Sequence, residues 1–293
     1  LEAYSARCGA LMFRGEQAAA DQALAAFGRV ADELQLPEAA WYFGRQRAQG
    51  CILRGDFDSG IAAIGELNVR SRRLGLGYGQ EFLAALQRRV RHDYQMAPDP
   101  TLQLEDHSML ALGLLDFIPN MRAQKARFAA ESGELAAAQS AVDWLASQGF
   151  DKIPKEISYL NSLVNLAIAV TKLGDLERAE QLYTLLTPYA QFNTPDGYLF
   201  DEGSVSHYLA LLAATLGWHE RVEAHFRSAI VLNRDMGRKP QLARTYYDFA
   251  VWTAEQDHHD ASAQAQSLAR EASVHAEAIG MQWLAQLARG LMT

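Results

Sequence analysis

The chain has 293 residues, of which 49% are hydrophobic, so it is long enough to bury a continuous core. Its formal net charge of −8 argues against nucleic-acid binding, and its apolar runs are too short and too often interrupted by charge to span a membrane. Its two cysteines, Cys8 and Cys51, fit a reducing cytoplasm and offer neither a disulfide framework nor a metal-binding set.

A short turn built around glycine recurs along the chain. The turn is clearest at Lys172–Tyr183, where Gly174 ends one helix and the Asp175 side chain caps the next. Leu176, Ala179, Leu182, Tyr183 and Leu186 then give the second helix one apolar face. The same turn occurs at Gly15, Gly55, Gly133, Gly174 and Gly217, which are spaced 40, 78, 41 and 43 residues apart. The period is therefore about 40 residues, which predicts an array of helical hairpins.

The helices expected from this period alternate between an A and a B helix on either side of each turn. In chain order they are residues 3–14, 16–34, 37–53, 57–74, 80–94, 101–117, 121–132, 134–147, 156–173, 176–189, 204–216, 220–236, 240–255, 260–279 and 282–292. The copy around residues 94–120 is irregular, and Gly237 and Gly280 look like helix C-caps. The sequence thus predicts an all-α, right-handed TPR-like solenoid of about seven hairpins, a single domain over residues 1–293 that was cut from a longer protein.

Two segments depart from the hairpin pattern. Gly75–Gly79 superficially suggests a phosphate loop, but no strand precedes it and no Lys-Ser/Thr follows, which favours a simple helix end. Gln191–Glu202 is the longest irregular segment and carries Tyr198 and Phe200. Its aromatic residues either pack over a helix end, or the segment forms a lid across the groove of the solenoid.

The A helices line the inner surface of such a solenoid, so their polar residues are candidate contacts for a partner. Asn161 and Asn165 share one helix face, and two neighbouring amides can clamp a peptide backbone; the alternative is that both are simply solvated. Arg244 and Asp248 also share a face, and a plain intrahelical ion pair is the alternative. The candidate groove residues are Arg45, Asn161, Asn165, His207, Arg244 and Asp248.

A local positive charge stands out in this acidic chain. Between residues 70 and 92, Glu81 is the only acidic residue against Arg70, Arg72, Arg73, Arg88, Arg89 and Arg91. This patch could hold an anion or an acidic neighbouring domain, or it could be a solvated face. Asp257–Asp260 and Glu105–His107 suggest a metal, but they lack metal-site spacing, and Asp260 reads better as a helix N-cap.

Several stretches resemble a known family. Gly203–Ile230 and Arg238–Ala250 look like the tetratricopeptide-type region that follows the ATPase module of large bacterial signalling ATPases, and Leu53–Asp58, Gly149–Pro154 and Leu182–Ala190 fit the same pattern. That group includes LuxR/MalT-like transcriptional activators and nucleotide-cyclase-linked ATPases. The resemblance implies a cytoplasmic helical scaffold that senses a partner and signals to an attached effector domain.

Three functions follow as hypotheses. The first is a non-catalytic module that binds a protein or peptide in the groove, with no cofactor, metal, nucleic acid or membrane involved. The second is the sensing of a small-molecule inducer in a pocket closed by residues 191–202. The third, an enzyme, is the weakest, because no acid–base or metal set is visible in the sequence.

Overall fold

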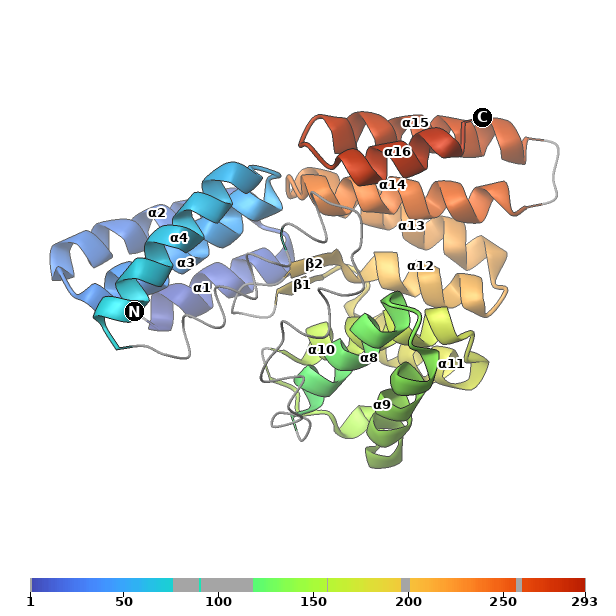
Figure 1. Cartoon of the computed structure of the whole chain (residues 1–293), viewed down its shortest axis with the longest axis horizontal. Coiled ribbons are helices and arrows are strands. Elements are labelled where there is room, and N and C mark those ends of the chain that lie inside the picture. Colours follow the sequence, from blue (N-terminus) through green and yellow to red (C-terminus); the bar gives the residue numbers. More distant parts are fainter. Residues whose placement is uncertain are drawn as a thin grey trace. The chain divides into compact units, whose positions relative to one another are not determined.

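The computed structural model describes residues 2–75, 90, 118–156, 158–195, 201–256 and 260–292. These residues form 13 α-helices, two short 3-10 helices and one two-stranded antiparallel sheet (Figure 1). The expected all-α class is confirmed at this level. The helices expected at residues 80–94 and 101–117 lie outside the described residues, apart from Val90.

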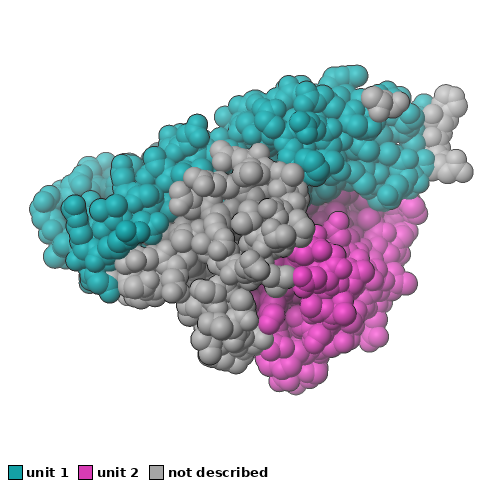
Figure 2. Space-filling model, in the orientation of Figure 1, with its two compact units in different colours: residues 1–98, 197–200, 230–293 teal, residues 99–196, 201–229 magenta. Residues whose placement is uncertain are grey.

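The chain divides into two compact units (Figure 2). Unit 1 comprises residues 1–98, 197–200 and 230–293, and unit 2 comprises residues 99–196 and 201–229. Helix α13 (His219–Asp235) contributes residues to both. The predictions of one continuous domain and of a right-handed array of seven hairpins are not tested by this division and stay predictions.

Unit 1 is built from helical hairpins at both ends of the chain. Consecutive helices pack against each other, and α1 also contacts α3, as α14 contacts α16. The unit contains α1 (Glu2–Arg14), α2 (Gln17–Leu34), α3 (Pro37–Leu53), α4 (Phe57–Arg73), α14 (Lys239–Ala254), α15 (Ala261–Glu277) and α16 (Gln282–Gly290).

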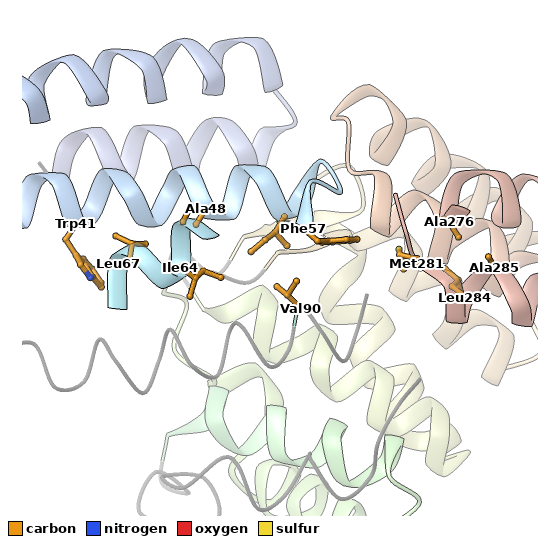
Figure 3. Close-up of a cluster of buried hydrophobic side chains, with 13 residues drawn as sticks. Trp41, Ala48, Phe57, Ile64, Leu67, Val90, Ala276, Met281, Leu284 and Ala285 are labelled. Carbon is orange, nitrogen blue, oxygen red and sulfur yellow. The ribbon is translucent and has the colours of Figure 1, made fainter. Parts of the chain in front are cut away.

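One buried cluster in unit 1 joins side chains from both chain ends (Figure 3). Phe57 and Ile64 of α4 belong to it, and so do Met281 and Leu284 at the C-terminal end. Each of these side chains is at most 5% exposed. Burying large apolar side chains is the main stabilising contribution to folding, so this cluster forms the core of unit 1.

Unit 2 is organised around α10. Its helix α10 (Tyr159–Leu173) contacts α8, α9, α11 and α12, which explains why it is buried along most of its length. The unit contains α8 (Pro119–Glu131), α9 (Leu135–Gln148), the 3-10 helix η2 (Phe150–Lys152), α10, α11 (Leu176–Leu186), the 3-10 helix η3 (Thr187–Tyr189), β1 (Asn193–Pro195), β2 (Asp201–Ser204) and α12 (Val205–Thr215).

The glycine turns have the backbone conformation that the sequence predicts. Gly15, Gly55, Gly133, Gly174 and Gly217 all have φ between 67° and 82°, a region that disfavours any residue with a Cβ atom. The Asp175 carboxylate accepts a hydrogen bond of 3.1 Å from the Arg178 backbone N–H, which confirms the predicted cap. Gly237 and Gly280 also have positive φ just after α13 and α15.

Two local predictions are wrong, and a third is right in position only. Leu176 is 59% exposed, because it is the first residue of α11 and lies at the edge of the face that Ala179, Leu182 and Leu186 bury. Residues 191–202 are not wholly irregular, because β1 and β2 pair there with Asn193 opposite Ser204. Asp260 occupies the N-cap position of α15, but its side chain makes no capping hydrogen bond.

Candidate functional site

Helices α8, α10 and α12 of unit 2 carry an unusual number of buried polar side chains. On α8 these residues recur every three or four positions, so they share one helix face. They include Asn120, Gln124 and Arg127 on α8, Asn161, Ser162 and Asn165 on α10, and Ser206 and His207 on α12, and each is at most 8% exposed. Arg127 bonds to Asn165 and Ser162 bonds to Asn120, so the polar faces of α8 and α10 meet, and α12, which carries His207, also packs on α10. We call this layer the polar cluster.

Arg127 lies at the centre of the polar cluster. Its Nη1 atom is 3.1 Å from Oε1 of Glu202 and 3.3 Å from Oδ1 of Asn165, and its Nε donates to Glu131 at 3.2 Å. The side chains of Arg127 and Glu202 are each only 7% exposed. A buried charge is tolerated when it is paired and hydrogen-bonded, and Arg127 meets this condition through three different elements.

Glu202 belongs to strand β2, so the ion pair holds the β1–β2 hairpin against α8. Further hydrogen bonds fix the hairpin internally: the Thr194 hydroxyl accepts from the Glu202 backbone N–H at 3.0 Å and donates to the Gly203 carbonyl at 3.2 Å. The Tyr208 hydroxyl of α12 donates to the Glu202 backbone carbonyl at 2.8 Å. The hairpin is therefore anchored to the polar cluster through both the side chain and the backbone of Glu202.

The two candidate asparagines form a directed pair inside the cluster. Asn165 Nδ2 donates to the Asn161 backbone carbonyl at 2.7 Å and to Asn161 Oδ1 at 2.9 Å, while Asn165 Oδ1 accepts from Arg127. Asn161 Nδ2 is fully buried and has no hydrogen-bond partner among the residues that the structure describes. The pair therefore offers one amide NH2 group whose hydrogen bonds are not made within the described residues. The burial of both residues excludes a solvated pair, and the predicted clamping of a partner backbone stays a prediction.

The other groove candidates do not join this pair. His207 is 5% exposed and packs edge-on against Tyr208 and Phe226. In unit 1, Arg45 is 4% exposed and lies over the rings of Trp41 and Tyr42 at 5.9 Å and 5.7 Å. Arg244 is exposed on α14 and Asp248 is partly exposed. The six predicted groove residues thus fall into both units, and Asn161 and Asn165 are hydrogen-bonded to each other.

Part of the predicted basic patch is described. Arg70, Arg72 and Arg73 are exposed in the last turn of α4. Arg88, Arg89 and Arg91, the lid residues Tyr198 and Phe200, and the motifs at 105–107 and 257–259 lie outside the described residues. Within the described ranges, no group of three or more His, Cys, Asp or Glu side chains is close enough to hold a metal ion.

Sequence reasoning missed Arg127 and Glu202. A usable signal was the polar series Asn120, Gln124 and Arg127 at helical spacing within an otherwise alanine-rich helix. Glu202 had no such signal, because its partner is 75 positions away in the sequence.

A second polar contact lies on α11 and α13. The Tyr183 hydroxyl is 2.8 Å from Nε2 of His225. Burial, and then the positive charge of Arg221, lowers the pKa of His225. The neutral imidazole is therefore the favoured form in this contact.

Unit 2 also has an open depression of about 530 Å³ between η2 and α11. Its lining includes Asp151, Glu177 and Glu180 but none of the residues predicted to bind a partner. The depression and the polar cluster are thus separate features of the unit.

The comparisons with known proteins yield no match. No protein-family model, curated protein or solved structure matches this chain. Its family resemblance therefore rests on sequence pattern alone. Among the described helices, none is long and apolar enough to cross a membrane.

Proposed function

We propose that the chain is a non-catalytic interaction and sensor module that binds a protein or peptide partner at the polar cluster of α8, α10 and α12. The observation that carries the proposal is the fully buried Nδ2 of Asn161, for which the described part of the chain supplies no hydrogen-bond acceptor. A buried donor left unsatisfied costs about 1–3 kcal/mol. A carbonyl oxygen of a bound partner would remove this cost, so binding there is favoured by the chain's own unmet hydrogen bond.

The β1–β2 hairpin gives this module two states. Glu202 is the buried ion-pair partner of Arg127, and the hairpin packs on α10, so we propose that movement of the hairpin opens the polar cluster to a partner. A partner that presents a carboxylate to Arg127 replaces the contact that Glu202 gives up. The exchange couples binding to a change in hairpin position, which is a physical basis for relaying the bound state.

The proposal extends to the setting of the module. We place it in the cytoplasm, attached to an effector domain of a bacterial signalling or transcription regulator, as a right-handed TPR-like solenoid of about seven hairpins. The resemblance at Gly203–Ile230 and Arg238–Ala250 supports this setting. The packing of consecutive helices, with next-but-one contacts such as α8 with α10 and α10 with α12, supports the repeat architecture.

A small-molecule inducer is the alternative ligand. The fully buried position of Asn161 favours this alternative, because a compact ligand can be enclosed where a long peptide would need a continuous open groove. In this version residues 191–202 act as a lid, and Arg127 and Asn161 supply the polar groups that orient the ligand.

Peptide selection tests the main proposal. The full chain is used to select binders from a displayed library of random 12-residue peptides, and the enriched peptides are measured by calorimetry. Asn161→Ala/Asn165→Ala should weaken them about tenfold, the effect of losing about 1.4 kcal/mol of hydrogen bonding, whereas the control Asn68→Ala on α4 should leave Kd unchanged. Unchanged affinity of the double variant, with its fold intact by circular dichroism, would refute the site.

Native mass spectrometry separates the two ligand classes. For a small molecule, the purified chain carries a bound mass that disappears in the Asn161→Ala/Asn165→Ala variant. For a peptide partner, the purified chain carries no such mass, but it forms a complex with the selected peptide that the double variant weakens.

A further inference from the structure

The last turn of α4 presents a compact charged surface that plays no part in the polar cluster. Arg70, Arg72 and Arg73 are exposed there within four consecutive residues, next to Val69, which is 51% exposed. Val69 is three residues before Arg72 and four before Arg73, so the three side chains are neighbours on the helix surface. We call these four residues the α4 patch.

The core of unit 1 fixes the direction in which the α4 patch faces. Ser71 and Leu67, which are at most 4% exposed, turn inward from the same helix turns. The Trp41 indole N–H of α3 donates a hydrogen bond of 2.7 Å to the Ser71 hydroxyl. This buried bond sets the rotation of the last turn of α4, so the α4 patch is held outward by a rigid scaffold.

The three arginines have no ion-pair partner among the described residues. The chain contains 35 acidic residues against 27 Lys and Arg, and the nearby Glu66 lies 3.9 Å from Arg47 of α3 instead. Arg70 and Arg73 face each other as like charges at i,i+3, which destabilises a helix slightly. The negative end of the helix dipole favours a cation in a last turn, but it acts on all three arginines only weakly at an exposed site.

We infer that the α4 patch is a docking surface for an acidic protein segment that also carries an aliphatic side chain. Carboxylates complement the three guanidinium groups, each of which can donate two parallel hydrogen bonds to one carboxylate. An aliphatic side chain covers Val69, and arginine beside an apolar residue is typical of protein interfaces. Nucleic acid fits less well, because the chain as a whole carries a charge of −8.

The test uses the full chain and two fluorescein-labelled synthetic peptides of alternating sequence. One combines Glu with Leu, and the other combines Gln with Leu as its uncharged match. We expect the acidic peptide to bind with a Kd that rises with salt, because the pairs are solvent-exposed. Arg70→Gln/Arg72→Gln/Arg73→Gln should weaken it at least tenfold, which corresponds to about 1.4 kcal/mol.

Two control variants separate the α4 patch from the general charge. Arg7→Gln/Arg29→Gln/Arg270→Gln removes the same number of exposed arginines from scattered positions, and it should leave the affinity of the acidic peptide within about twofold. Val69→Ser keeps every charge and should weaken the Glu–Leu peptide several-fold, but not a peptide of Glu and Ser.

Other results would overturn the inference. If the scattered variant weakens binding of the acidic peptide as much as the α4 triple variant does, the net charge of the chain and not the α4 patch is responsible for binding. A single-stranded oligonucleotide that binds more tightly than the acidic peptide would indicate nucleic acid, and inorganic phosphate alone competing at low millimolar concentration would indicate a simple anion site. Salt-sensitive self-association that only the α4 triple variant abolishes, with no binding of the peptide, would make a second copy of the chain the partner.

Discussion

Replacing Glu202 by Gln tests how the β1–β2 hairpin is held. The change keeps the size of the side chain and removes its charge, which leaves the Arg127 guanidinium, 7% exposed, without its closest buried carboxylate at 3.1 Å. Breaking a buried pair from one side costs about 3–5 kcal/mol. Because Glu131 still contacts Arg127 at 3.2 Å, we expect a loss near the lower end, about 3 kcal/mol.

The assay is urea denaturation of the full chain followed by tryptophan fluorescence, together with hydrogen exchange of the hairpin residues. The control is Glu223→Gln, which removes the carboxylate of the exposed Arg227–Glu223 pair and should cost less than about 1 kcal/mol. Glu202→Gln should also speed exchange at β2, where the Glu202 N–H bonds to Thr194. A loss no larger than that of Glu223→Gln, with unchanged exchange, would refute the anchoring role.

Three further predictions concern the scaffold. Gly174→Ala, at φ 67° with free space around it, should lower the unfolding free energy by about 1–2 kcal/mol, whereas Gly55→Ala should lower it more, because its new Cβ would lie 2.6 Å from Ile279. A higher urea midpoint for either variant would contradict this. Leu166→Ala in the buried centre of α10 should cost about 2–5 kcal/mol by the same measurement, and an effect below 1 kcal/mol would show that α10 is not the core of unit 2. Burial lowers the pKa of both His225 and His275, so the unfolded chain binds protons at these residues more readily, and the unfolding free energy should fall as the pH drops through about 6.5. His225→Gln/His275→Gln should make the unfolding free energy depend less on pH, and an unchanged slope would exclude a contribution from the two histidines.

The parts of the fold that depend on local chemistry could be predicted from the sequence. Each glycine turn follows from a residue that tolerates positive φ, and the Asp175 cap follows from a side chain three residues before the N–H it binds. The pairing of Asn161 with Asn165 likewise follows from their i,i+4 spacing. These features require no knowledge of distant segments.

The candidate site could be predicted only in part, because its decisive contacts join distant segments. The turn residues of 191–202 indicate a loop, but the pairing of Asn193 with Ser204 depends on a hairpin anchored by α8 and α12. The burial of Asn161 depends on helices packing on two sides of α10, which periodicity does not reveal. The sequence therefore located the asparagines but not their buried environment.

Photo-cross-linking tests the central claim most directly. A peptide selected on the full chain is resynthesised with a photoreactive phenylalanine analogue, irradiated in the complex, and its attachment sites are mapped by mass spectrometry. The proposal predicts attachment to α8, α10 or α12, with less product in Asn161→Ala/Asn165→Ala. Attachment confined to the α4 patch or to the depression between η2 and α11, at the same yield in the double variant, would contradict it.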